Sequence, residues 1–212
     1  MALTFDIEHP DRPTRPEITP RLLDELVRLD VGATAFVQGR WAEAYPEVAA
    51  RIAREGHLVG SHSHYHARMP LFNRPGLRSD IRTAERHIRR LCGVDPRPWF
   101  RLPFGDGTGD RLLEARIAAL GYRVVGWHVD ARDWASRRAG PVLDRVVDGV
   151  MAHGDGSVVL LHGWPGVTLD AVPRICDRLR AAGAEFVRID ELDGVPADRG
   201  PDAADAPPIG MA

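Results

Sequence analysis

The sequence predicts a single α/β domain whose strands run parallel, in either a barrel or a doubly wound sheet. Short apolar segments alternate with longer segments of helical periodicity along most of the 212 residues. Repeated β-α units of this kind imply parallel strands. A chain of this length also fits one domain with a sizeable core. Because no linker-like segment divides residues 1–196, we assign them to one domain.

The first two elements show the alternation clearly. Residues 2–6 are short and apolar, as in a buried strand, and a polar, Pro-rich turn follows at 8–20. Thr19 and Pro20 have the residue types preferred at the N-cap and the first position of a helix. Helical spacing then follows in a set of leucines, namely Leu22, Leu23, Leu26 and Leu29.

The same alternation continues to residue 189. Further strands are predicted where apolar residues cluster in short segments, at 33–37, 58–61, 99–102, 123–129, 157–161 and 186–189. Helices are predicted between them, where apolar residues recur at helical spacing, at 45–55, 77–91, 110–120, 141–152 and 169–182. Gly32 and Gly56 follow the first two helices, as is usual where a helix ends.

Composition restricts the partners of the chain. The formal net charge is −2, so no basic field indicates a nucleic-acid partner. No apolar run approaches the ~20 residues that a membrane span needs. No pattern indicates an oligomeric state, which the sequence leaves unknown.

The two ends of the chain carry expectations of their own. Met1 leads almost directly into the first predicted strand, without a signal peptide. As it stands the chain is expected to be cytoplasmic, and an extracytoplasmic mature form with a missing leader is the alternative. Residues 197–212 are rich in Asp, Ala and Pro, and we expect a disordered tail there.

Five groups of polar residues fall at the carboxyl ends of predicted strands, which is the face where parallel α/β barrels build active sites. The first group contains Asp6 and Glu8. Side chains two apart on a strand share a face, so these carboxylates project together while Ile7 turns into the packing. Such a pair can serve as a base and a metal ligand. The alternative is a turn cap at Asp6 and a solvated Glu8.

The second group is the histidine-rich segment that follows residue 61. His62 and His66 are four apart, so one helical turn would put both imidazoles on one face. This spacing suits a divalent metal such as zinc, which accepts nitrogen and carboxylate ligands. A surface loop rich in histidine is the alternative. His64 would point away from the pair, and we assign it no ligand role.

The remaining groups supply charge partners. Arg101 can form a bidentate pair with a carboxylate, for which Asp6 is the natural partner. His162 follows a strongly apolar strand, and Asp130 or Asp133 can steer it as a general acid near neutral pH. A satisfied structural histidine is the alternative for His162.

Other reactive residue types have no comparable setting. Five histidines are left without a role, namely His9, His57, His87, His128 and His153. Cys92 and Cys176 form no metal-type cluster. They are either buried thiols or a disulfide pair, and the sequence leaves both open.

These groups together resemble the polysaccharide deacetylases of the NodB-homology type, carbohydrate esterase family 4. The resemblance runs from about Leu3 to Leu192. Five motifs stand in the family's order: Thr4-Phe5-Asp6, His62-Ser63-x-x-His66, Arg101-x-Pro103-Phe104-Gly105, Asp130-x-x-Asp133-Trp134 and Leu160-Leu161-His162.

The resemblance implies a fold and a set of roles. It implies a single-domain, distorted barrel of the (β/α)7 type. Asp6 matches the catalytic base, and Arg101 matches the residue that orients this base. His162 matches the general acid, and Asp133 matches the carboxylate that tunes it. His62 and His66 match metal ligands that act with a carboxylate of the first motif.

The resemblance also implies a substrate groove. Trp134 and Leu160 match walls that hold the acetyl methyl group. The backbone N–H of Phe104, at a position usually held by Tyr, would help to bind the oxyanion.

One departure concerns the metal. The family's common first motif is Thr-Phe-Asp-Asp-Gly, whose second Asp binds the metal, but here that position is Ile7, which has no donor atom. We expect Glu8 to replace it. Zinc is the metal we expect, and cobalt, nickel and manganese are alternatives for such a donor set.

The resemblance implies a metal-dependent hydrolase that removes N-acetyl groups from an N-acetylglucosamine-containing polysaccharide, peptidoglycan or chitin-like, and releases acetate. One alternative is hydrolysis of a small non-peptide amide, as in allantoinase-like relatives of the fold. Another is a degenerate, non-catalytic carbohydrate-binding domain, which Ile7 motivates and the intact remaining motifs disfavour.

Overall fold

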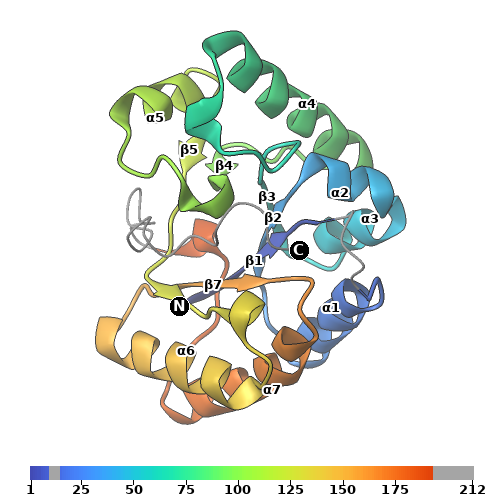
Figure 1. Cartoon of the computed structure of the whole chain (residues 1–212). Helices are drawn as coiled ribbons and strands as arrows, with labels where there is room; N and C mark the ends of the chain where they lie inside the picture. Colours follow the sequence, from blue (N-terminus) through green and yellow to red (C-terminus); the bar gives the residue numbers. More distant parts are fainter. Residues whose placement is uncertain (10–14, 193–212) are drawn as a thin grey trace.

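The computed structural model describes residues 1–9 and 15–192 (Figure 1). Within these ranges, seven parallel strands form one sheet in the order β5-β4-β3-β2-β1-β7-β6. The strands are β1 (Ala2–Ile7), β2 (Thr34–Val37), β3 (Leu58–Ser61), β4 (Trp99–Phe100), β5 (Arg123–Val124), β6 (Val129–Asp130) and β7 (Val158–His162). The expected disordered tail, 197–212, lies outside the described residues.

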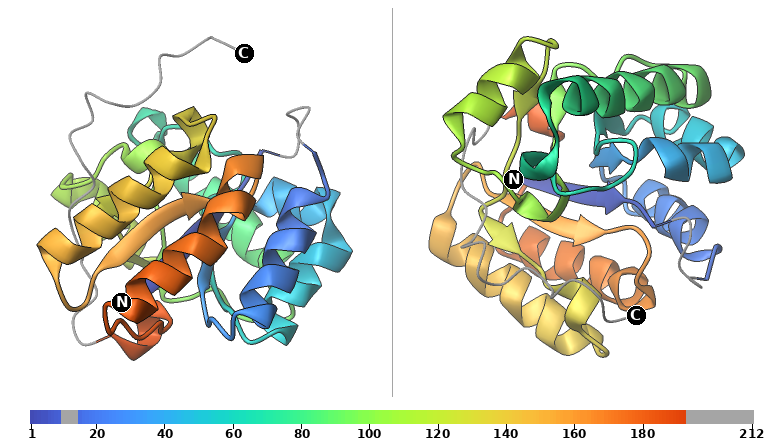
Figure 2. Two further views of the ribbon diagram at one scale, coloured as in Figure 1. Left: turned by 90° about the horizontal axis from the view of Figure 1, so that it is seen from below. Right: turned by 45° about the horizontal axis from the view of Figure 1, so that its top comes forward.

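Helices surround the strands on the outside of the sheet (Figure 1). They are α1 (Ile18–Arg28), α2 (Gly39–Ala44), α3 (Pro46–Arg54), α4 (Arg74–Cys92), α5 (Arg111–Ala118), α6 (Ala139–His153) and α7 (Gly166–Ala181). The sheet curls into a half-barrel, which confirms the predicted α/β barrel-like fold. Figure 2 shows α6 and α7 side by side along β7.

The two faces of β1 separate the core from the inside of the curl. Leu3, Phe5 and Ile7 are buried in the main hydrophobic cluster, together with residues of the outer helices. Ala2 belongs instead to a smaller cluster that includes Phe36, Val125, Trp127 and Leu160. Because side chains alternate along a strand, Asp6 projects to the same face as Ala2. The first predicted site residue therefore stands inside the curl, at the carboxyl end of its strand.

The beginning of α1 differs from the prediction at Thr19. The helix begins at Ile18, two residues earlier than a Thr19 cap would allow. The Thr19 hydroxyl donates instead to the carbonyl of Gly163, at 2.9 Å. Pro20 still lies in the first turn, where its missing N–H breaks no helical hydrogen bond. Thr19 thus fastens α1 to the loop that follows His162.

Two strand predictions are wrong in detail. The segment 123–129 is not one strand, because β5 and β6 lie at opposite edges of the sheet and residues 125–128 pass between them. The segment 186–189 forms no strand. Its Val187 N–H donates to the carbonyl of Met1, just before β1, at 3.0 Å, and its Ile189 N–H donates to the Thr34 hydroxyl of β2 at 3.2 Å. β1 already pairs with β7 from Ala2 to Asp6 and with β2 from Thr4 to Ile7, so only its first residues remain open to this segment.

The helix prediction at 45–55 also changes. It is realised as α3, but a further helix, α2, precedes it. Neither this helix nor any other in the described ranges combines the length and apolar character that a bilayer crossing requires. Cys92 and Cys176 are both free and buried, so the thiol interpretation is correct.

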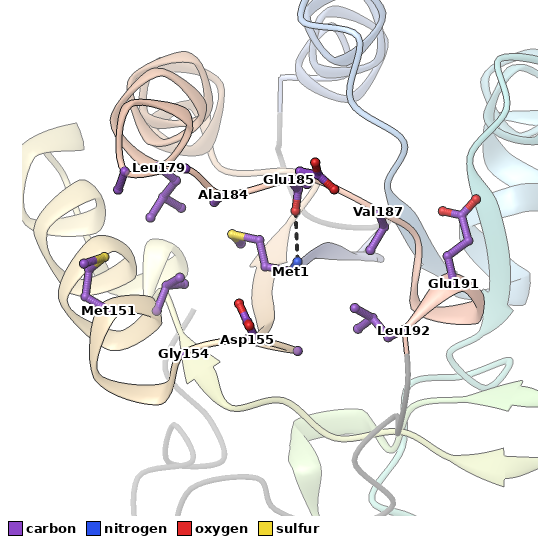
Figure 3. Close-up of a pocket in the computed structure, with 14 residues that line it drawn as sticks. Met1, Met151, Gly154, Asp155, Leu179, Ala184, Glu185, Val187, Glu191 and Leu192 are labelled. Carbon is purple, nitrogen blue, oxygen red and sulfur yellow. Dashed lines mark hydrogen bonds between the residues drawn. The ribbon is translucent and has the colours of Figure 1, made fainter.

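A pocket lies at the amino end of the strands, away from the predicted site residues (Figure 3). Met1, Asp155 and Glu185 are among its lining residues. The Met1 ammonium donates to the Glu185 carbonyl at 2.9 Å, so its charge is engaged there. The carboxyl ends of the strands carry the groups described next.

Candidate active site

The strand register brings the predicted site residues together. One row of paired residues crosses four strands, Ile7, Val37, Ser61 and Phe100. His62 and Arg101 come directly after this row, at the ends of β3 and β4. On the other side of β1, Asp6 pairs with His162 of β7. The parallel sheet therefore gathers residues from distant parts of the chain at one end.

Arg101 and Asp6 form a buried ion pair. The Arg101 side chain is fully buried, and its Nη1 donates to Asp6 Oδ1 at 3.0 Å. Its other nitrogens donate to the carbonyls of Val125 (3.4 Å) and Gly126 (3.1 Å). The guanidinium also lies 4.1 Å from the ring centroid of Phe36. With these contacts Arg101 holds the Asp6 carboxylate in one orientation and leaves Oδ2 facing His62, 3.5 Å away.

Glu8, His62 and His66 meet in a compact cluster. Glu8 Oε2 lies 3.2 Å from His62 Nε2 and also contacts His66 Nε2. The two imidazole nitrogens are 3.1 Å apart. His62 Nδ1 must donate to the Arg101 carbonyl, at 3.0 Å, because a carbonyl oxygen only accepts. A neutral His62 therefore presents the lone pair of Nε2 to the cluster.

This donor set fits a metal ion. With metal–nitrogen and metal–oxygen bonds of about 2.0–2.1 Å, neighbouring ligand atoms on a tetrahedron lie about 3.3–3.4 Å apart. Two of the three separations among these atoms, 3.1 and 3.2 Å, are close to that value, and the third, between Glu8 Oε2 and His66 Nε2, is shorter. Ile7, by contrast, is buried in the main core and faces away. Of the two positions, only Glu8 brings a carboxylate to the two histidines, as the strand argument expects.

The charge state of the cluster favours a cation. Burial alone would raise the pKa of Glu8, but the interactions with His66, His62 and His9 outweigh burial and hold this pKa well below the ordinary value. Burial lowers the pKa of His66, which favours the neutral imidazole that ligation requires. The pKa of His62 is raised despite burial, because Asp6 and Glu8 face it. The two carboxylates that favour a proton on His62 would also attract a divalent cation at the same place.

His9 joins this cluster, although its sequence setting gave it no role. Its Nε2 lies 2.8 Å from Glu8 Oε1, and the geometry groups it with Glu8 and His66 as a candidate ligand. Trp164 also donates to Glu8 Oε1, at 3.2 Å. A residue next to Glu8 on a strand would point the opposite way. His9 does not follow this alternation, because β1 has ended before it and the backbone of His9 has a φ of 62°.

His162 and Asp133 form the second ion pair. His162 Nδ1 lies 2.8 Å from Asp133 Oδ1, and the His162 backbone N–H donates to Asp133 Oδ2, also at 2.8 Å. Asp133 is fully buried and accepts further hydrogen bonds from the Thr168 hydroxyl and the Trp134 N–H. Nδ1 is thus engaged, and Nε2 is the nitrogen left for exchange with a substrate. Of the two predicted carboxylate partners, Asp133 rather than Asp130 makes the contact.

Three further residues were predicted to form the substrate groove. Phe104 has a left-handed backbone, with a φ of 60°, and its ring lies against His66 with centroids 4.4 Å apart. Trp134 is half-buried beside Asp133. Leu160 is buried in the inner cluster, two residues before His162 on the same strand face. The roles of Phe104, Trp134 and Leu160 toward a substrate remain predictions.

Sequence comparison relates this site to a known family. A family model for polysaccharide deacetylases matches residues 1–125. The chain is 34% identical to the peptidoglycan-N-acetylglucosamine deacetylase of Bacillus cereus over 196 residues, which are 91% of this chain and 67% of that protein. The chain is also 34% identical over 194 residues to the peptidoglycan-N-acetylglucosamine deacetylase PgdA of Listeria monocytogenes, of which it spans 39%.

Structure comparison agrees. A solved peptidoglycan N-acetylglucosamine deacetylase gives a TM-score of 0.78 at 32% identity, over 93% of this chain and 89% of that one. A wild-type carbohydrate esterase family 4 pseudoenzyme from Bacillus anthracis gives 0.80 at 26% identity, over 90% of this chain and 64% of that one. Fold likeness thus extends to both an enzyme and a pseudoenzyme. Taken with the matches in sequence, it shows that the chain belongs to the polysaccharide deacetylase family.

Proposed function

We propose that this chain is a metal-dependent hydrolase that removes N-acetyl groups from an N-acetylglucosamine-containing polysaccharide, peptidoglycan or chitin-like, and releases acetate. One observation carries the proposal. A carboxylate held by a buried arginine, Asp6, and an imidazole held by a buried carboxylate, His162, are register partners on adjacent strands beside a Glu-His-His cluster. A base, an acid and a cation site thus stand within one small volume.

The cluster of Glu8, His62 and His66 would hold the metal, with zinc as the proposed ion. When bound, zinc supplies a Lewis acid that polarises the acetyl carbonyl and lowers the pKa of water. His9 and Trp164 support the cluster through the second oxygen of Glu8. A mixed nitrogen and oxygen donor set also accepts cobalt, nickel or manganese.

The residues of the chain move the protons. Water adds to the acetyl carbon as Asp6 takes one of its protons, and Arg101 keeps this carboxylate oriented for the transfer. His162 then donates the proton on Nε2 to the sugar nitrogen. The carbon–nitrogen bond breaks, and acetate and a free amine leave. Asp133 compensates the charge of His162 before the transfer and fixes its ring throughout.

The substrate assignment rests on the relatives. The Bacillus cereus relative is named for N-acetylglucosamine in peptidoglycan, and this chain contains the matching motifs. A chitin-like oligomer presents the same N-acetylated sugar. The Phe104 N–H is the proposed additional donor to the oxyanion, with Trp134 and Leu160 as walls for the acetyl methyl group.

A second candidate function has an observation in its favour. Ile7 removes the usual carboxylate, and a family pseudoenzyme shares the fold with a TM-score of 0.80. A non-catalytic carbohydrate-binding domain is therefore the competing proposal. A binder has no need of the two buried ion pairs, each of which costs desolvation.

Acetate release separates these proposals. The purified chain would be freed of metal with a chelator and incubated with N-acetylglucosamine oligomers, with and without added zinc. Zinc-dependent acetate is the expected result. Hydrolysis of small amides without acetate release from oligomers would instead indicate an allantoinase-like enzyme. Oligomer binding without hydrolysis of either substrate would indicate a binding domain.

A further inference from the structure

A second group of metal-ligating side chains lies on the opposite side of the histidine-rich loop. Glu43 of α2, His64 of the loop after β3, and His87 of α4 come from three separate elements. Their ligand atoms all lie within 4.8 Å of one another. Glu43 Oε1 is 3.1 Å from His87 Nδ1, and Glu43 Oε2 is 3.8 Å from His64 Nε2. The two imidazoles are stacked, with centroids 5.2 Å apart.

The loop holds His64 in this position independently of the active site. His62 and His66 point into the Glu8 cluster, whereas His64, midway between them, points to the other side of the loop, toward Glu43. Asp80 of α4 accepts the backbone N–H of His64 at 2.9 Å and that of Tyr65 at 3.0 Å. The loop is therefore fastened to the same helix that carries His87.

The surroundings of His64 direct one nitrogen to the cluster. The residue is 5% exposed, and its Nδ1 is buried without a hydrogen-bond partner among the described residues. This nitrogen faces Gly39, where a Cβ would approach within 2.5 Å. Nε2 is thus the atom through which the ring can make a polar interaction, and it faces Glu43.

We propose that Glu43, His64 and His87 form a second metal site, which takes one transition-metal dication of the zinc type. Two imidazole nitrogens and a carboxylate are the donor set that such ions accept. Glu43 is 41% exposed, so water can complete the coordination. The site joins α2, α4 and the loop that carries His62 and His66, which gives it a structural role distinct from the active site.

Two neighbouring cations, Arg40 and Arg90, oppose binding, and Arg90 provides a test. Arg90 Nη2 lies 3.2 Å from His87 Nδ1 and is on the exposed side of α4. Guanidinium only donates, so it competes for the lone pair that a metal needs. Arg90→Ala should therefore tighten zinc binding at this site severalfold. If the three residues formed only an ion-pair network, Arg90→Ala would leave zinc affinity unchanged.

Zinc stoichiometry tests the proposal directly. Chelator-stripped protein would be titrated with zinc, separated from free metal by gel filtration, and analysed for bound zinc. The wild type should retain about two equivalents, and His87→Ala and Glu43→Gln about one. His153→Ala, which removes an exposed histidine from α6, is the matched control and should retain two. Circular dichroism would establish that each variant is folded.

A complementary variant separates this proposal from the active-site assignment. His62→Ala/His66→Ala should retain about one equivalent, which a further His87→Ala removes. If the wild type and His87→Ala retain the same amount of zinc with the same affinity, the second site is ruled out. If instead His62→Ala/His66→Ala and the wild type bind alike, the active-site metal is the assignment that fails.

Discussion

At the scale of single residues, the site depends on charges that are buried in pairs. Burial alone would lower the pKa of His162, but the Asp133 carboxylate outweighs burial, and Glu8 and Asp6 add to its effect, so that the pKa rises to about 10. His162 is therefore protonated at neutral pH, as a general acid must be before it donates. A bound dication would offset the charges of Glu8 and Asp6 and leave Asp133 as the main cause of the raised pKa.

Replacement of Asp133 by Asn should move the alkaline limb of the pH–rate profile. Activity requires protonated His162, so it is lost as pH rises through the pKa of that residue. In the wild type this limb should lie well above neutral pH and no higher than about 10. In Asp133→Asn it should fall toward the ordinary histidine value of about 6.5, and kcat at neutral pH should drop by about 10²–10⁴.

The measurement is kcat for acetate release between about pH 5 and pH 11, a range that spans the expected pKa of His162 in both proteins. Asp130→Asn provides the control, because Asp130 accepts a hydrogen bond from the Arg132 N–H and makes none with His162. The same alkaline limb in Asp133→Asn and wild type would exclude His162 as the acid that Asp133 controls.

Residue spacing predicted part of the site, and its omissions have physical reasons. The two-residue period of a strand is enough to bring Asp6 and Glu8 to one face. His62 and His66 do meet, but not through the helical turn that their spacing suggested, because residues 62–68 form a loop in which Ser63 and His66 have left-handed backbones. His9 could not be predicted, because its place depends on a backbone turn after β1. The partnership of Glu43, His64 and His87 could not be predicted either, since it arises where three separate elements pack.

At the scale of elements, β1 sorts its side chains between two environments. Ile7 is 2% exposed in the main core, whereas Asp6 and Glu8 point into the site. Ile7 is also packed tightly against the loop after β7, because a Cβ at Gly163 would lie 2.4 Å from Ile7 Cδ1. The position of the family's usual second carboxylate thus belongs to the core in this chain.

Ile7→Asp should therefore destabilise the protein and leave zinc affinity no tighter. The new carboxylate would be buried without a partner, which should lower the free energy of unfolding by on the order of 4 kcal/mol. Denaturant unfolding and zinc titration of the same preparation would measure both effects. Ile7→Val is the conservative control, with an expected cost of about 1 kcal/mol. Tighter zinc binding in Ile7→Asp at unchanged stability would contradict this placement.

Element boundaries were predictable only where local pattern determines them. The long amphipathic segment that became α4 and the apolar segment that became β7 were predicted within a few residues. Residues 123–129 are apolar enough for one strand, yet β5 pairs with β4 and β6 pairs with β7. Residues 186–189 have strand-like composition but meet β1, which beyond its first residues is already paired with β2 and β7. In both cases the outcome depends on which strands pair with each other, and sequence periodicity does not specify that pairing.

At the scale of the whole molecule, Arg101 links the two edges of the curled sheet. It stands after β4, binds Asp6 of β1, and donates to the carbonyls of residues 125 and 126, where the chain crosses from β5 to β6. The guanidinium thus serves three parts of the fold at once. The same contacts that orient the proposed base hold the crossing segment over the inside of the half-barrel.

Arg101→Lys should lower both stability and activity in spite of the conserved charge. An ammonium cannot reproduce the planar fork of donors, so buried carbonyls or Asp6 would lose a partner. Each such loss costs about 1–3 kcal/mol. Urea midpoints would measure the loss, with Arg123→Lys as the control because Arg123 is exposed on β5. Equal midpoints for Arg101→Lys and the wild type would refute this linking role.

The central claim is that Glu8 completes a working metal site in place of the usual second aspartate. Its most direct test is zinc affinity and acetate release of Glu8→Gln beside the wild type, on the same oligomer and after the same chelation. Glu8→Gln should bind zinc about 10–100-fold more weakly at the active site, and acetate release should be reduced at limiting zinc. A Glu8→Gln protein that binds zinc and releases acetate like the wild type would contradict the claim.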